Sequence, residues 1–151
     1  MKDINFLKQS LIAHRGYHDR NKKIIENSIE SFKKAIEYNY IIELDIHMLK
    51  DGNIVVFHDN NLKRVCGINK MISDLSYDEI KKYNLFNTES KIPLLKDVLR
   101  LVDGKVPLLI EIKYYHKYGI IEKELIKMMK NYKGKFAVQS FYPKTIFWFK
   151  K

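Results

Sequence analysis

The 151-residue sequence has a single cysteine, Cys66, and no long apolar run. One cysteine excludes an intramolecular disulfide, so we expect a reducing compartment and interpret Cys66 as structural or incidental. A membrane-spanning helix needs roughly 18 or more consecutive apolar residues, and no stretch meets that requirement. The first residues also lack the apolar core of a signal peptide. We therefore predict a cytoplasmic protein without a transmembrane segment.

Glycine-rich phosphate loops, fixed-period repeats and low-complexity linkers are absent as well. Gly16 stands alone, without the G-x-G-x-x-G spacing of a dinucleotide-binding loop. Hydrophobic residues make up 46% of the chain and charged residues 30%, a balance typical of a globular domain rather than a disordered chain. The length suits a single domain, which we place at residues 1–151.

Basic residues outnumber acidic residues, 28 against 18, which gives a formal net charge of +10. This excess favours anionic partners such as phosphate esters, nucleic acid or acidic lipid. A solvated lysine-rich surface explains the same excess. Because the basic residues are spread along the chain and do not form a short patch with aromatic residues, we expect no nucleic-acid binding.

Apolar strand-like runs alternate with amphipathic helix-like runs, the pattern of a parallel α/β fold. The predicted strands are 11–13, 41–49, 54–57, 106–112 and 136–141. Helices are predicted after a capping box at Asn27-x-x-Glu30, after a second box at Ser76-x-x-Glu79, after Pro93, around 121–129 and after Pro143. Residues 60–71 are predicted to form a loop.

Ionisable side chains interrupt strands that should be apolar when buried on both faces. The two-residue period of a strand puts Glu43, Asp45 and His47 on one face of 41–49. The same period puts Glu111 and Lys113 on one face near the end of 106–112. Because an unpaired buried charge is costly, these groups must meet partners or a ligand.

The chemistry of the set indicates phosphoester hydrolysis. Three carboxylates converging from two strands make a hard, oxygen-rich site suited to Mg²⁺ or Ca²⁺. Arg15 and Lys113 supply positive charge for a phosphate, the arginine through its bidentate fork. His14 and His58, at the ends of two predicted strands, can act as general acid and base near neutral pH.

Each feature also has a structural interpretation. Glu43 with Lys113, or Asp45 with Arg15, can be an ion pair inside a barrel. Asp59 can cap a turn or support its neighbours. Three other histidines have no assigned role: His18 and His116, which we expect at the surface, and His47. The functional interpretation is favoured because the candidates all lie at strand C-termini, where α/β enzymes place their sites.

Six segments resemble the motifs of the glycerophosphodiester phosphodiesterase family, in family order and at family-like intervals. They are Ala13-His14-Arg15-Gly16, Glu26-Asn27-Ser28, Glu43-Leu44-Asp45, Lys50-Asp51-Gly52 continuing to Val56-Phe57-His58-Asp59, Glu111-Ile112-Lys113, and Gln139-Ser140-Phe141. One such motif alone is a weak signal, whereas six in order are a strong one.

The resemblance implies a TIM (β/α)8-type barrel that hydrolyses glycerophosphodiesters to glycerol 3-phosphate and an alcohol. The family is thought to react through a cyclic phosphate formed by the neighbouring glycerol hydroxyl. Carried over by motif, the roles are metal binding of Mg²⁺ or Ca²⁺ by Glu43, Asp45 and Glu111, proton exchange by His14 and His58, phosphate binding by Arg15 and Lys113, and support by Glu26, which would orient Arg15, and by Asp59.

A complete barrel of this kind needs about 250 residues, and 151 residues hold five predicted strands. We therefore expect an incomplete barrel with about five of eight βα units, a C-terminally truncated domain whose open edges permit self-association. Two alternatives stay open. One is a non-catalytic remnant that binds phosphate esters or a protein partner. The other is a five-stranded, doubly wound sheet that binds an anionic ligand.

Overall fold

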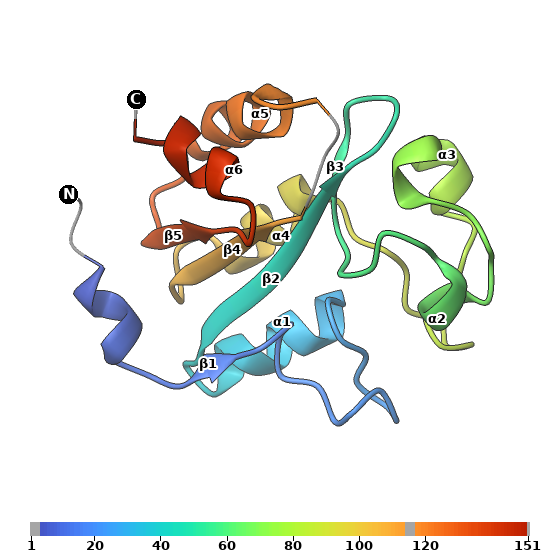
Figure 1. Ribbon diagram of the computed structural model, residues 1–151. Coiled ribbons are helices and arrows are strands. Elements are labelled where there is room, and N and C mark those ends of the chain that lie inside the picture. The colour runs from blue at the N-terminus through green and yellow to red at the C-terminus, as the bar shows by residue number, and fades with distance from the viewer. Residues whose placement is uncertain (1–3, 114–116, 151) are drawn as a thin grey trace.

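The computed structural model describes residues 4–113 and 117–150, which form one mixed α/β unit (Figure 1). Five strands are present in these residues, as predicted: β1 (Ile12–Ala13), β2 (Ile41–Met48), β3 (Ile54–Val56), β4 (Leu108–Ile112) and β5 (Phe136–Gln139). The longer helices are α1 (Ile29–Glu37), α4 (Leu95–Val102), α5 (Ile120–Met129) and α6 (Pro143–Trp148). Short helical segments are η1 (Asn5–Lys8), α2 (Lys63–Cys66), η2 (Ile72–Asp74) and α3 (Tyr77–Ile80). None of the helices in the described part is long and apolar enough to cross a membrane.

The sheet has the parallel order β1-β2-β4-β5, and β3 pairs with β2 outside this path. The β3 strand runs antiparallel to β2, with Val56 opposite Ile46. This corrects the expectation that all five strands belong to parallel βα units. Only residues 49–53 separate β2 from β3, and a parallel crossover needs a dozen or more residues. Four parallel strands therefore form the wall of the barrel, and β3 is a hairpin partner of β2.

The sheet packs against two separate apolar cores. Ile42, Leu44 and Ile46 of β2 are fully buried and pack with side chains of α1, α4 and α5. The second core lies under the segment that carries α2 and α3, beyond the end of β2 in Figure 1. The two-residue period of β3 divides its side chains between the cores, because Val56 belongs to the first and Val55 to the second.

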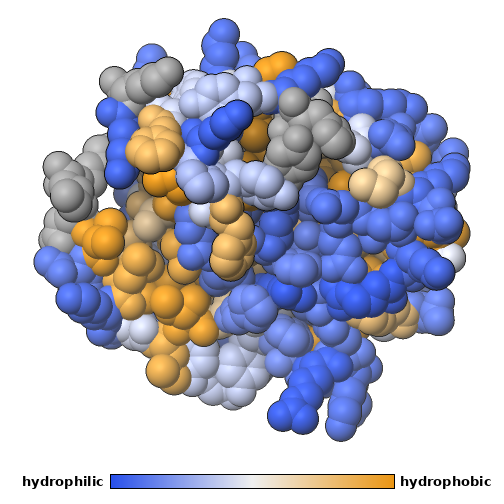
Figure 2. Space-filling view, in the orientation of Figure 1, coloured by the Kyte–Doolittle hydropathy of each residue, from blue (hydrophilic) through white to orange (hydrophobic). Residues whose placement is uncertain are grey.

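Both edges of the sheet are open to solvent. Leu11 and Ile12, at the β1 edge, are 66% and 43% exposed, and every residue of β5 is half-buried. Figure 2 shows apolar side chains gathered along the side of the molecule where η1, β1 and β5 lie. The described residues thus form an arc of barrel wall and not a closed barrel.

One of the two predicted capping boxes is displaced by a residue. Ser28 caps α1, and its hydroxyl accepts from the Ser31 N–H at 3.1 Å. Asn27 was predicted to cap this helix, but it has a φ of 52° and its side chain bonds elsewhere, to Asp45. The box of Ser76 and Glu79 forms as predicted, with the Ser76 N–H donating to the Glu79 carboxylate at 2.8 Å.

Replacing Gly16 or Gly52 by alanine separates the cost of backbone strain from the cost of a steric overlap. Both glycines have left-handed backbone, with φ of 81° and 83°. A methyl group at Gly52 meets no atom of the described residues within 4 Å, so we expect Gly52→Ala to lower the free energy of unfolding by about 1–2 kcal/mol through backbone strain alone. Gly16→Ala would also overlap the Ser31 side chain, whose Cβ lies 2.8 Å from the added methyl. We expect it to cost about 1–3 kcal/mol more. Urea unfolding of both variants measures the difference, and equal losses would contradict the tight contact with Ser31.

Candidate metal and phosphate site

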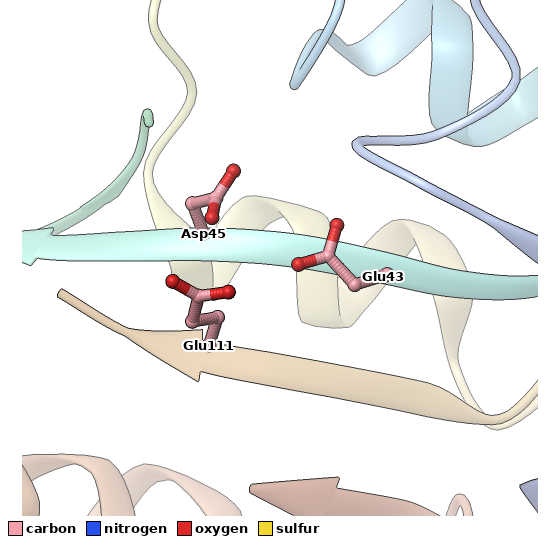
Figure 3. Close-up of side chains that lie close together, drawn as sticks. All are labelled: Glu43, Asp45 and Glu111. Atoms are coloured by element: carbon pink, nitrogen blue, oxygen red, sulfur yellow. The ribbon is translucent and has the colours of Figure 1, made fainter. Parts of the chain in front are cut away.

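Three carboxylates meet at the C-terminal end of the parallel strands (Figure 3). Glu43 and Asp45 share one face of β2, and the parallel register pairs Asp45 with Glu111 of β4. Ligand oxygens of the three side chains lie within 4.8 Å of one another. All three residues are buried, with exposures of 3%, 1% and 6%. The sheet register thus creates the carboxylate cluster that the sequence predicted.

Two basic side chains border this carboxylate cluster. Lys113 Nζ lies 2.8 Å from Asp45 Oδ1 and also pairs with Glu111. Arg15 Nε lies 3.5 Å from Asp45 Oδ2. Both contacts with Asp45 are charge contacts without hydrogen-bond geometry. Asp45 Oδ1 and Arg15 Nε are therefore buried atoms that have no hydrogen-bond partner among the described residues. Of the two structural ion pairs considered from the sequence, Asp45 with Arg15 forms, whereas Lys113 pairs with Asp45 and Glu111 instead of Glu43.

The carboxylate cluster holds more negative charge than its basic neighbours balance. Burial, together with the charges of Asp45 and Glu111, raises the pKa of Glu43 to about 7. The backbone N–H of Arg15 opposes this effect, because it donates to Glu43 Oε2 at 2.9 Å. A divalent cation would remove this conflict, because it favours ionised oxygen ligands. The all-oxygen, buried donor set therefore fits Mg²⁺ or Ca²⁺.

Two histidines face the same end of the sheet. His14 follows β1, and partial burial together with the Arg15 charge lowers its pKa. His58 follows β3, and its Nδ1 lies 2.7 Å from Asp59 Oδ1. Because a carboxylate oxygen only accepts, Nδ1 carries the proton, and Nε2 is the nitrogen that can exchange a proton with a ligand.

A cleft of about 420 Å³ opens beside these groups. Its lining combines ionisable and apolar side chains: His58, Asp59, Asn60, Glu111, Ile112, Lys113, Phe141 and Tyr142. Phe141 is 86% exposed, so it gives the cleft an apolar wall open to solvent. The position of Lys113 and Glu111 in the lining makes the cleft continuous with the carboxylate cluster.

Two amides that the sequence did not assign to the site hold its carboxylates. Asn27 Nδ2 donates to Asp45 Oδ2 at 2.9 Å, and Gln139 Nε2 donates to Glu111 Oε2 at 3.3 Å. Gln139 lies opposite Glu111 in the β4–β5 register. Both amides belong to segments that resemble family motifs, and that position was the available signal.

The histidines without an assigned role differ in placement. Burial lowers the pKa of His47 to about 4, and its Nε2 donates to the His58 carbonyl oxygen at 3.1 Å. His18 is half-buried with a buried Nδ1, which corrects the expected surface position. The cause is the loop itself, which folds back so that the Tyr17 N–H donates to the Ser31 carbonyl at 3.0 Å. His116 lies outside the described residues.

Cys66 carries no sign of reactivity. It is half-buried on α2, and burial raises the pKa of its thiol to about 11. A reactive cysteine needs a lowered pKa, because the thiolate is the nucleophile. The structural interpretation of Cys66 therefore agrees with its environment.

Buried Glu26 connects Arg15 to a further arginine. Glu26 Oε1 accepts from Arg15 Nη1 at 3.0 Å and from Arg64 Nη2 at 2.6 Å. Burial raises the pKa of this carboxyl, but hydrogen bonds from Arg64 and Asn21 and the two arginine charges outweigh burial and lower it to about 2. The contact with Arg15 is the one that an orienting role requires.

Glu26→Gln should weaken the fold and reduce its sensitivity to acid. The folded pKa of about 2 lies below the ordinary 4.5, so ionised Glu26 stabilises the fold above about pH 4.5 and loses this effect as pH falls toward 2. Because Arg64 is 43% exposed, solvent screening limits the loss at pH 7 to about 1–2 kcal/mol.

Urea unfolding at pH 7, 5, 4 and 3 tests this expectation for Glu26. Glu37→Gln is the control, because Glu37 is 63% exposed and pairs with Lys34 across the surface of α1. We expect a change of at most about 0.5 kcal/mol for it. Identical pH profiles for Glu26→Gln and the unsubstituted protein would contradict the stabilising network around Glu26.

Comparisons with known proteins identify the family. The model of the glycerophosphoryl diester phosphodiesterase family matches residues 14–146. A glycerophosphodiester phosphodiesterase from Caldanaerobacter subterraneus subsp. tengcongensis is 38% identical over 135 residues, covering 83% of this chain and 54% of that protein. Human lysophospholipase D GDPD1 is 34% identical over 134 residues, covering 80% of this chain and 41% of that protein.

A solved structure supports the same assignment. The crystal structure of a glycerophosphodiester phosphodiesterase from Parabacteroides distasonis superposes with a TM-score of 0.77 at 29% identity, covering 90% of this chain and 58% of that one. This similarity confirms the predicted TIM-barrel class. The chain spans about half the length of the curated relatives it matches. The matched family model, the relatives and the shared fold show that the chain belongs to the glycerophosphoryl diester phosphodiesterase family.

Proposed function

We propose that this domain takes part in metal-dependent hydrolysis of glycerophosphodiesters, releasing glycerol 3-phosphate and an alcohol. The observation that carries the proposal is the carboxylate cluster of Glu43, Asp45 and Glu111. Two basic side chains and two histidines lie beside it at one end of the sheet. Family membership supports the same reaction class. The diester is the substrate class named for the Caldanaerobacter relative.

The carboxylate cluster would hold Mg²⁺ or Ca²⁺, and the bound cation would supply charge stabilisation for the phosphate oxygens. Arg15 would bind the phosphate through its guanidinium fork, and Lys113 would act as a point charge. Asn27 and Gln139 would keep the carboxylates in position through the hydrogen bonds described above.

The two histidines would exchange protons with the substrate. His14 has a lowered pKa, so it is suited to accept the proton of the glycerol hydroxyl next to the phosphate. The hydroxyl oxygen forms a P–O bond, the P–O bond to the alcohol breaks, and the alcohol oxygen takes the Nε2 proton of a His58 ring that carries protons on both nitrogens. Water then opens the cyclic phosphate: one water proton goes to His58 Nε2, the water oxygen bonds to phosphorus, the ring P–O bond to the glycerol hydroxyl oxygen breaks, and that oxygen recovers the proton from His14.

One alternative has a specific observation in its favour. The sheet edges at β1 and β5 are open, so a non-catalytic domain could bind a protein partner or a second copy of itself through those edges. Binding without hydrolysis by the folded chain would favour this alternative.

Asp45→Asn should weaken binding of the divalent cation. We expect Mg²⁺ or Ca²⁺ to raise the melting temperature of the unsubstituted protein, because a ligand that binds only the folded state stabilises it by mass action. Asp97→Asn is the control, since Asp97 pairs with Arg100 on the surface of α4. Thermal unfolding with each cation and with a chelator measures the effect. An unchanged melting temperature at millimolar Mg²⁺ and Ca²⁺ would argue against the metal site.

His14→Ala and His58→Ala should each lower kcat for a glycerophosphodiester by about 10²–10⁴-fold, the usual contribution of general acid–base catalysis. Release of glycerol 3-phosphate from glycerophosphocholine, with Mg²⁺, Ca²⁺ or Mn²⁺, measures it. The Asp97→Asn control should retain the rate of the unsubstituted protein. Turnover that survives both histidine substitutions would refute the proton-exchange roles.

A further inference from the structure

Arg64 lies outside the segments assigned to the site, yet it contacts two of the site's carboxylates. It belongs to the short helix α2 in the segment predicted to be a loop. Its Nη2 and Nη1 donate to the two oxygens of Glu26 at 2.6 and 3.3 Å. Its Nε and Nη2 donate to the two oxygens of Asp59 at 2.7 and 2.9 Å. One guanidinium therefore makes paired contacts with both carboxylates.

These contacts complete a chain of hydrogen bonds across the site. At one end Arg15 Nη1 donates to Glu26 at 3.0 Å. At the other end His58 Nδ1 donates to Asp59 at 2.7 Å. Arg64 stands between the two carboxylates, so the group suited to bind phosphate and the group suited to exchange a proton are joined through alternating charges.

The geometry requires an arginine at this position. A guanidinium presents five N–H groups in a rigid plane and can serve two carboxylates at once, whereas a lysine ammonium is a single point charge. The Phe86 ring lies 5.6 Å from the guanidinium carbon, and the Phe86 N–H donates to the Val65 carbonyl at 2.7 Å. Val65 is buried in the second core, so α2 holds the arginine from behind.

We propose that Arg64 is a positioning residue that fixes the Arg15 guanidinium and the His58 imidazole relative to each other through Glu26 and Asp59. The proposal rests on the proposed function for the roles of Arg15 and His58. Without the guanidinium, Glu26 and Asp59 would keep like charges on the same side of the site. The Asp59 carboxylate would lose both contacts that fix its rotation, and His58 Nδ1 would lose a fixed acceptor.

Arg64→Gln and Arg64→Lys test this inference by two measurements. The first is the ¹⁵N spectrum of the His58 ring, assigned by its loss in His58→Ala and recorded where the imidazole is neutral. We expect one tautomer with the proton on Nδ1 in the unsubstituted protein and a mixture of tautomers in both variants. The second is kcat and KM, with kcat/KM expected to fall about 10–100-fold.

Arg100→Gln is the matched control, because Arg100 pairs with Asp97 at 3.3 Å on an exposed surface. It should change neither the His58 spectrum nor the kinetics. If Arg64→Gln does not fold, Arg64→Lys, which keeps the charge, is the deciding variant. On an Asp59→Asn background, Arg64→Lys should leave the His58 spectrum as it is in Asp59→Asn alone, because Arg64 acts through Asp59.

The outcomes separate this inference from the proposed function. An unchanged His58 tautomer in a folded Arg64 variant overturns the positioning role, whatever the turnover. A kcat/KM within about twofold of the unsubstituted value overturns it as well. A chain without turnover refutes the proposed function for this chain, and the ¹⁵N spectrum still decides whether Arg64 positions His58.

Discussion

Repulsion among three buried carboxylates is the constraint on which the rest of the site depends. Glu43, Asp45 and Glu111 are brought together by the register of two central parallel strands, and that register is fixed because a slip of one residue would turn the apolar face of β2 toward the site. The nearby arginine, lysine and side-chain amides all act on this charge. Burial and the charges of Asp45 and Glu111 keep the pKa of Glu43 raised despite these partners.

Much of the site could be predicted from the sequence because strands obey a strict period of two. Glu43 and Asp45 had to share a face, and Glu111 had to lie near the end of a neighbouring strand. The direction of β3 was predicted wrongly. The five residues between β2 and β3 are too few for a parallel crossover, so the short connection already indicated an antiparallel pair. The contact of Asn27 with Asp45 was not predicted, because the position of Asn27 also suits a helix cap and only the tertiary structure decides between the two.

Contacts between irregular segments could not be predicted, for a different reason. Arg64 meets Glu26 across 38 residues of sequence, and neither residue lies in a strand or a long helix. No periodicity relates the two positions, so their contact depends on how residues 57–94 fold over the second core. The contacts of Arg64 consequently had no signature in the sequence beyond the charges of the residues involved.

The alternation of β3 between two cores has a consequence for how the molecule opens. Val56 is anchored with the main sheet, while Val55 and Phe57 are anchored with the segment that carries Arg64. A cooperative opening of the smaller core would release His58, Asp59 and Arg64 together and leave the carboxylates of β2 and β4 in place. The carboxylates and His58 thus rest on different cores, so amide hydrogen exchange around His58 can proceed while β2 and β4 stay protected.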